Sequence, residues 1–355
     1  DRQWSRGLGD VYKRQGDTIK ATVQRIAALR LLISLGGGLL AAHWLAGLSW
    51  SLAAVFSAIV LATGPTVVTP LVRQIRLAPP LGEVLEAEGL VLEPIGAVLA
   101  LLLLELVLGN LHGWREVMLG LLYRLGGGVL IGASVGWLLS ELLRRLKPDQ
   151  LKGLPLQLSL GLLFLMYGVS EWLLPESALP ASVAAGIVVG RRPGPHTAEL
   201  DGLIQELAQL AITMLFPLLA ADVSWAELSP LGWGGILCVL SLMLVVRPIG
   251  VGLATIGLPY KLEQRLFLGW LAPRGIVTAA VASLFAIRLE QAGILGAGRL
   301  QGLVFLTILM TVGLQGLTAQ PLARALGLVE ADDDEPASAE AAAQSRQVLT
   351  DSGQQ

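Results

Sequence analysis

The sequence contains few of the residues on which catalytic and metal sites usually depend. One cysteine and three histidines occur among 355 residues, and only 5% of the residues are aromatic. The single cysteine, Cys238, excludes a disulfide within the chain and a thiolate metal cage. His43, His112 and His196 lie near the ends of apolar segments or between them, and none has a partner at metal-ligand spacing. We therefore expect no cofactor, and the lack of a nucleophile–base pair argues against an enzyme.

Charge is also scarce, and its distribution indicates a membrane protein. Charged residues make up 15% of the chain, against about 25% in a typical soluble domain. They gather in short clusters between apolar stretches of about 20 residues, the length that crosses a bilayer as a helix. We predict an all-α fold, a polytopic membrane helical bundle. Its ten spans are expected at about 26–47, 50–72, 80–108, 115–143, 153–174, 178–190, 202–221, 231–257, 264–288 and 302–320.

Lys and Arg concentrate on every second connection between these spans, which predicts their orientation. The basic connections hold Lys20/Arg25, Arg73/Arg76, Arg144/Arg145/Lys147/Lys152, Arg191/Arg192, Lys261/Arg265 and Arg324, whereas the alternate ones hold only Arg115, Arg288 and Arg299. Both ends of the bundle are therefore expected in the cytoplasm, with the spans in the cell inner membrane. Six tryptophans lie at the ends assigned to the outside, where indole favours the membrane interface: Trp44, Trp50, Trp114, Trp172, Trp225 and Trp233.

Composition divides the chain into three parts. Residues 1–16 are polar and aperiodic and begin without Met, so we interpret them as a ragged or non-native leader on a chain that starts within a protein. Residues 17–328 form the predicted transmembrane domain. Residues 329–355 are acidic and rich in Ala, Ser and Gln, a composition typical of a disordered tail.

Two carboxylates interrupt the third apolar segment. Glu88 and Glu93 lie within an otherwise apolar run, and Pro94 follows directly. An ionised group at bilayer depth is costly and usually marks an ion or proton path. Five residues correspond to about 140° around a helix, so the two side chains have different neighbours. Glu93 is the candidate for exchanging cation and proton and Glu88 for a structural ion pair, unless Glu88 lies at the interface and only Glu93 is buried.

Arg274 lies in the middle of the ninth segment and requires a carboxylate or water. We expect Glu88 as its partner, because that pair would leave Glu93 free to titrate; an unpaired Arg274 in a water-filled vestibule is the alternative. Arg247, before Pro248, lies nearer a segment end, from which its side chain could extend to the interface.

Two spans contain breaks in their helical pattern. Thr63, Gly64 and Pro65 lie in mid-span, and a helix interrupted there can present carbonyl and hydroxyl oxygens to a cation. A simple proline kink is the alternative. Thr311 and Gly313 suggest a weaker break in the last span, so that the pair would be consistent with an inverted repeat.

One helix shows a regular glycine repeat. Gly128, Gly132 and Gly136 recur every four residues, which predicts close approach of another helix. A hinge between moving bundles is the alternative.

Four motifs in order resemble the cation:proton antiporter superfamily, in its sodium/hydrogen exchanger branch. They are ATGPTVV at 62–68, EGLVLEP at 88–94, APRGIV at 272–277 and TVGLQGLT at 311–318, and the resemblance covers about residues 17–328. It implies that Glu93 is the exchange carboxylate, that Glu88 pairs with Arg274 and that Thr63 is a cation ligand. It also implies a homodimer, and some thirteen helices, so that the first few would be missing here.

The motifs depart from the family pattern at four positions. Gly64 stands where the family has Asp, Gly89 where it has Ser, Leu92 where it has Asn, and Glu93 where it has Asp. Three oxygen-bearing side chains are therefore absent. Carboxylates and carbonyls suit a hard monovalent cation, but these residues do not choose between Na⁺ and K⁺.

The resemblance and the buried carboxylate together predict secondary active transport. Glu93 would release a proton when the monovalent cation binds and regain it when the cation leaves, one for one, while one helix bundle moves against another. An uncoupled channel or a ligand-gated sensor on the same fold is the alternative, since expected ligands are missing. Saturable exchange would distinguish the antiporter from a channel, which gives unitary currents.

Overall fold

The computed structural model describes residues 25, 28–145, 153–192, 197–221 and 228–329. The predicted leader and nearly all of the predicted tail lie outside these residues. The described part is all-α, as predicted, apart from an isolated bridge between Leu77 and Val329. Five helices within it are long and apolar enough to cross a membrane, and four shorter helices are also apolar. The full set of ten spans and their orientation stay predictions.

The helices follow the predicted apolar segments closely. After the helix Ala28–Trp44 come α2 (Trp50–Ile59), α3 (Pro65–Ile75), α4 (Leu81–Val107), α5 (Trp114–Arg145), α6 (Leu154–Leu173), α7 (Ala178–Gly190) and α8 (Thr197–Ala221). The short 3-10 helix η1 (Ser229–Leu231) leads to α10 (Gly232–Ser241), the π-helix η2 (Leu242–Val246), α11 (Arg247–Ala254), α12 (Leu262–Trp270) and α13 (Ile276–Gln291). The last described helix consists of α14 (Ala297–Met310), the π-helix η3 (Thr311–Gln315) and α15 (Gly316–Ala325).

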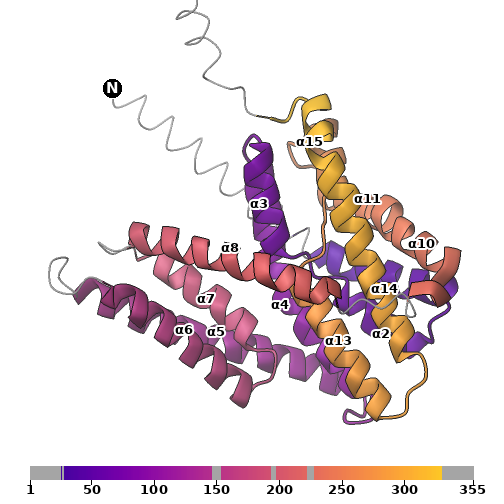
Figure 1. Ribbon diagram of the computed structural model, residues 1–355, viewed down its shortest axis with the longest axis horizontal. Helices are drawn as coiled ribbons and strands as arrows, with labels where there is room; N and C mark the ends of the chain where they lie inside the picture. The colour runs from indigo at the N-terminus through magenta and orange to yellow at the C-terminus, as the bar shows by residue number, and fades with distance from the viewer. Residues whose placement is uncertain (1–24, 26–27, 146–152, 193–196, 222–227, 330–355) are drawn as a thin grey trace, which may run out of the picture.

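The order of elements shows a repeat. A helix, an interrupted helix and a second helix occur near the start as Ala28–Trp44, α2/α3 and α4. The same order recurs near the end as α10–α11, α12/α13 and α14–α15. These elements form one side of the molecule in Figure 1, and α5 to α8 form the other. The helix α4 packs against both groups, since it contacts α2, α3 and α12 as well as α5 and α7.

Small residues let the helices of the second group approach closely. At Gly132 an added Cβ would collide with the carbonyl oxygen of Ala181 on α7, and at Gly128 it would lie 2.6 Å from the carbonyl oxygen of Ser177. Gly136 meets Ala185 in the same way, at 2.7 Å. The glycine repeat therefore lets α5 pack closely against α7, as the spacing predicted.

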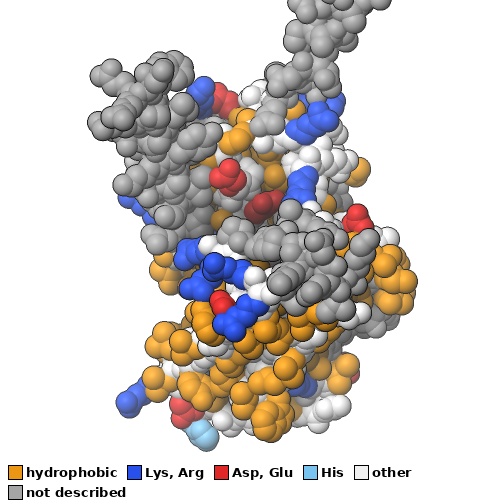
Figure 2. Space-filling model, turned by 90° about the vertical axis from the view of Figure 1, so that its left-hand side faces the viewer, with side chains coloured by type: hydrophobic (Ala, Val, Ile, Leu, Met, Phe, Trp, Pro, Cys, Tyr) orange, Lys and Arg blue, Asp and Glu red, His pale blue; other side chains and the backbone are white. Residues whose placement is uncertain are grey.

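Burial separates the central helix from the outer ones. Two thirds of the most apolar window of α4 is buried (67%), against 17% for α5 and 17% for α6. The outer helices expose large apolar side chains such as Leu122, Phe164 and Trp172, which suits contact with lipid. On the face drawn in Figure 2, hydrophobic side chains cover most of the lower half, and most of the visible Lys and Arg lie above them.

The core consists of two apolar clusters with charged residues between them. One cluster includes Phe56, Val98 and Phe285, and the other includes Leu85 and Phe267. Along α4, the first cluster begins after the stretch that carries Glu88 and Glu93, and the second ends before it. The two carboxylates therefore lie in a middle layer between the two apolar clusters.

Candidate functional site

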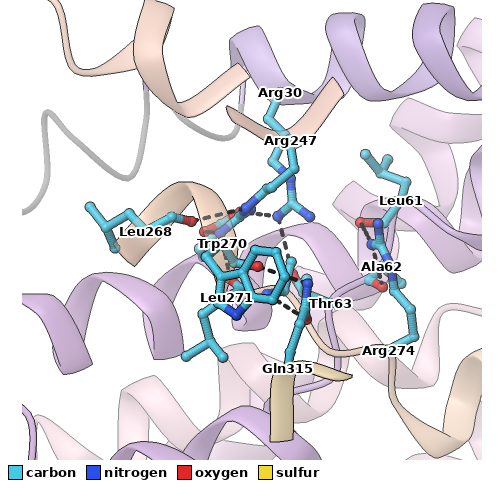
Figure 3. A network of polar contacts seen from close by, with 12 residues as sticks. Arg30, Leu61, Ala62, Thr63, Arg247, Leu268, Trp270, Leu271, Arg274 and Gln315 are labelled. Carbon is cyan, nitrogen blue, oxygen red and sulfur yellow. Dashed lines mark hydrogen bonds and ion pairs between the residues drawn. The ribbon is translucent and has the colours of Figure 1, made fainter. Parts of the chain in front are cut away.

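Two interrupted helices meet in this middle layer. The first break, at residues 60–64, separates α2 from α3, and the second, at residues 271–275, separates α12 from α13. Arg274 lies in the second break, and its Nη1 donates to the carbonyl oxygens of Leu61 (3.2 Å) and Ala62 (3.1 Å) in the first. Both carbonyls lie in the break just past the end of α2, near the negative end of its helix dipole. One guanidinium thus joins the two breaks (Figure 3).

Side chains from the last helix satisfy the backbone of the second break. The amide of Ala272 donates to Oε1 of Gln315 (3.0 Å), and Nε2 of Gln315 donates to the carbonyl of Trp270 (2.7 Å). The amide of Arg274 donates to Oγ1 of Thr311 (3.3 Å). Unwound backbone at this depth requires such partners, because no lipid group can supply them.

The predicted break at Thr311 and Gly313 is wrong. These residues lie in the π-helix η3, where the chain stays helical without interruption from α14 to α15. The wider turn of a π-helix keeps the backbone hydrogen-bonded, and such turns are frequent at functional sites. The interrupted helix is the preceding one, at residues 271–275, and Thr311 serves as an acceptor for it.

The predicted pair of Glu88 with Arg274 is also wrong. Glu88 is 1% exposed, and its ion-pair partners are Arg30 and Arg247. Nη1 of Arg30 and Nη1 of Arg247 both donate to Oε1, and Nη2 of Arg247 donates to Oε2 at 3.0 Å. Arg274 is held at the first break instead, where two carbonyls replace the carboxylate.

Arg247 does not extend to the interface, because it is 3% exposed. Besides Glu88 it binds the end of α12, where Nε donates to the carbonyl of Leu268 (3.1 Å) and Nη2 to that of Leu271 (3.0 Å). In each interrupted helix, a guanidinium therefore binds carbonyl oxygens near the end of the first half. Arg274 does so just past α2, and Arg247 does so at the end of α12 (Figure 3). A cation at a helix C-terminus is the favourable charge there.

Glu93 is buried, and no ion pair joins it to another of the described residues. Its side chain is 7% exposed, and Oε1 has no hydrogen-bond partner among the described residues. Close by on α4, Gly96 brings that helix against the first break, since an added Cβ would lie 3.2 Å from the amide nitrogen of Ala62. The carboxylate therefore projects from the turn of α4 just before its contact with the break.

The predicted residues of the first break fall where a half-helix begins. Thr63 is 3% exposed, Gly64 is the N-cap of α3 in extended conformation, and Pro65 is the first residue of α3. No side chain caps this helix start. Pro65 needs no acceptor there, since it lacks an N–H. The chain is therefore interrupted at this point rather than merely kinked.

Sequence reasoning missed Arg30 and Thr278 of this layer, as well as Gln315, which partners the second break. Arg30, on the helix Ala28–Trp44, is 1% exposed, and a basic residue inside an apolar run was the signal for it. Thr278, in the first turn of α13, is 2% exposed, and its Oγ1 has no partner in the described part of the chain. Threonine inside an apolar helix gives no comparable signal.

The buried charges do not balance. Among the described residues, three arginines (Arg30, Arg247 and Arg274) and two glutamates (Glu88 and Glu93) are buried. Within the described residues no three His, Cys, Asp or Glu side chains group as metal ligands. In the described part of the chain, Glu93 Oε1 and Thr278 Oγ1 are buried oxygens without a hydrogen-bond partner, and the buried Thr63 lies in the first break.

A pattern typical of hydrolases occurs in α5. Residues 132–136 match Gly-x-Ser-x-Gly, the pattern of a nucleophile elbow, which requires a sharp strand-to-helix turn. Here the pattern lies inside α5, and Oγ of Ser134 donates to the carbonyl of Leu130 one turn earlier (2.8 Å). The serine is therefore part of a continuous helix and has no elbow.

The fold and site define a class of protein. An all-helical bundle with a repeated pattern, two interrupted helices in contact and a buried carboxylate beside them is the architecture of secondary transporters. The family comparison agrees, because the sequence model of the transmembrane sodium/hydrogen exchanger family matches residues 17–325. The chain belongs to this family and is a multi-pass membrane protein.

Related proteins support the same assignment. The chain is 26% identical to the probable Na(+)/H(+) antiporter 2 of Methanocaldococcus jannaschii over 76% of the chain and 69% of that protein. It is 28% identical to the K(+)/H(+) antiporter NhaP2 of Shewanella sp. (strain MR-4) over 80% of the chain but 49% of that protein. The chain thus spans about half to two thirds of these relatives.

A solved structure has the same fold. The sodium proton antiporter MjNhaP1 from Methanocaldococcus jannaschii, determined at pH 8, superposes with a TM-score of 0.74 and 24% identity. The match covers 89% of the chain and 80% of MjNhaP1. It confirms the predicted fold class.

Proposed function

We propose that this protein is a secondary active transporter that exchanges a monovalent cation, Na⁺ or K⁺, for H⁺ across the membrane. The observation that supports it most directly is Glu93, a buried carboxylate whose Oε1 has no hydrogen-bond partner among the described residues, three residues before Gly96, where α4 contacts the first break. Cations and protons compete for such a group, because each supplies the positive charge that the carboxylate lacks. The relatives, named as Na⁺/H⁺ and K⁺/H⁺ antiporters, support this proposal.

Glu93 would bind proton and cation in turn. When the cation enters, the carboxylate releases its proton and coordinates the cation together with oxygens from Thr63, Gly64 and the first turn of α13. When the cation leaves, the proton returns. Glu88 takes no part in this exchange, since both of its oxygens are already paired. A single exchanging carboxylate favours one cation for one proton.

The remaining parts of the proposal concern the surroundings of this site. We place ten spans in the cell inner membrane with both ends in the cytoplasm, and we propose a homodimer. Movement of the group that contains the breaks against α5–α8 would expose the site to each side in turn. We propose a transporter rather than an enzyme.

Reconstitution into liposomes tests the proposal. A pH-sensitive dye reports proton movement when Na⁺, K⁺ or Li⁺ is added outside. We expect saturable exchange from the parent protein and a loss of at least about 100-fold with Glu93→Gln, because an amide cannot release a proton. Glu83→Gln, on an exposed residue of the same helix, is the control and should behave as the parent. Parental exchange by Glu93→Gln, or unitary currents without saturation, would overturn the proposal.

A further inference from the structure

Arg30 connects the ion pair of Glu88 to the first break. Its Nη1 donates to Oε1 of Glu88 and lies 3.3 Å from Oγ1 of Thr63, to which it also donates. The side chain comes from the helix Ala28–Trp44 and reaches the layer where Arg247 approaches as well (Figure 3). A single nitrogen thus touches both a paired carboxylate and a candidate cation ligand.

The negative charge of Glu88 is neutralised by Arg247 without help from Arg30. Arg247 alone donates to both oxygens of Glu88, which is the two-point geometry that neutralises a carboxylate best. The second guanidinium therefore adds a positive charge in excess of the buried carboxylates that the structure describes, which are two against three arginines. Consistent with this surplus, Nε and Nη2 of Arg30 have no hydrogen-bond partner in the described part of the chain.

The unbalanced positive charge of Arg30 would act on a cation bound at Thr63. A guanidinium that donates to the Thr63 hydroxyl occupies one of its lone pairs and places positive charge within hydrogen-bond distance of it. A monovalent cation at the same hydroxyl would meet like charge in a region that excludes water, where such repulsion is large. Binding is then possible only while Glu93 is ionised, which prevents the cation and the proton from occupying the site together.

We propose that Arg30 is a positioning residue that sets cation affinity: by holding the Thr63 hydroxyl and adding an unbalanced charge, it weakens cation binding and makes it depend on ionised Glu93. This inference rests on the proposed exchange activity. It differs from a purely structural role, in which removal of Arg30 could lower the amount of folded protein but could not tighten cation binding.

The test compares three variants of the reconstituted protein with the parent. Arg30→Gln removes the charge but keeps a hydrogen-bond donor, and Arg30→Lys keeps the charge. Arg124→Gln is the matched control, since Arg124 also pairs with a glutamate, Glu105, at 3.2 Å, twelve residues beyond Glu93 on α4 and hence about 18 Å from it. The KM for Na⁺ and for K⁺ is measured at alkaline pH, where protons no longer compete.

We expect the KM of Arg30→Gln to fall on the order of tenfold for the transported cation. Arg30→Lys and Arg124→Gln should keep the parental KM. A KM of Arg30→Gln that is unchanged or raised, while the parent exchanges normally, would overturn the role of Arg30 alone. If the parent exchanges no cation, the proposed function itself fails. If Arg30→Gln gives too little folded protein, the KM values of Arg30→Lys and Thr63→Val are measured instead. The inference requires that Thr63→Val raises the KM for the cation and that Arg30→Lys leaves it unchanged.

Discussion

Arg247 donates to both carboxylate oxygens of Glu88, a residue that lies 159 positions earlier in the chain. The same guanidinium binds the carbonyls of Leu268 and Leu271, where α12 ends at the second break. One side chain therefore ties α4, α11 and the interrupted helix together in the middle layer. The structure uses Arg247, and not Arg274, for the pair that sequence reasoning assigned to Glu88.

Replacing Arg247 should destabilise the protein strongly. Arg247→Gln leaves Glu88 with Arg30 alone and removes the donors at the end of α12. We expect a loss of about 3–5 kcal/mol in the free energy of unfolding, the usual cost of breaking a buried ion pair. Thermal unfolding in detergent measures it. Arg30→Gln should cost less, since Glu88 keeps both bonds to Arg247; equal unfolding temperatures for the two variants would contradict this ranking.

Gln315 should be required for the second break. Gln315→Leu removes the acceptor of the Ala272 amide and the donor to the Trp270 carbonyl, so two buried backbone groups lose their partners. Each such loss costs about 1–3 kcal/mol. We expect a lower unfolding temperature and slower exchange. Gln301→Leu is the control, because Gln301 donates to a side chain, Oγ of Ser283, at 3.4 Å and not to the backbone of the break; a similar effect of both variants would mean that the break does not depend on Gln315.

The contact between α5 and α7 should not tolerate a side chain at Gly132. An added methyl group would collide with the Ala181 carbonyl, whereas nothing lies within 4 Å of the same position at Gly126. Gly132→Ala should cost about 1–3 kcal/mol through overpacking, and Gly126→Ala should be neutral or stabilising. Unfolding temperatures of the two variants measure the difference. A stable Gly132→Ala protein would show that the helices can separate without penalty.

Glu176, in the connection between α6 and α7, should make stability depend on pH. Burial, with a smaller contribution from the charge of Glu171, raises the pKa of Glu176 from 4.5 to about 7, although Arg124 and Arg288 lower it in part. The folded state then holds a proton that the unfolded state has lost, so stability falls as pH rises from 4.5 to 7. Above pH 7 the penalty is complete.

The variant Glu176→Gln removes this penalty. Its unfolding temperature should exceed the parental value at pH 8, and the difference should shrink toward pH 5. Glu83→Gln, at an exposed residue, is the control and should show no such trend. A difference that stays constant between pH 5 and 8 would contradict the role of Glu176.

The sequence by itself determined the class of fold and the central carboxylate. Apolar runs of about 20 residues allow only helices, because backbone groups in lipid must be satisfied within the segment. A glutamate in such a run cannot face acyl chains at acceptable cost, so burial of Glu93 followed from its position alone. Gly-Pro in mid-span likewise marked the first break.

Only the tertiary structure decided which charges meet. Glu88 had Arg30, Arg247 and Arg274 within reach in principle, and the choice depends on how four helices pack, which no local pattern encodes. The predicted break at Thr311 was misplaced for the same reason: its hydroxyl donates within its own helix and also accepts from the Arg274 amide in the neighbouring break. Long-range pairing is decided by geometry between elements, whereas burial and helicity are decided within each segment.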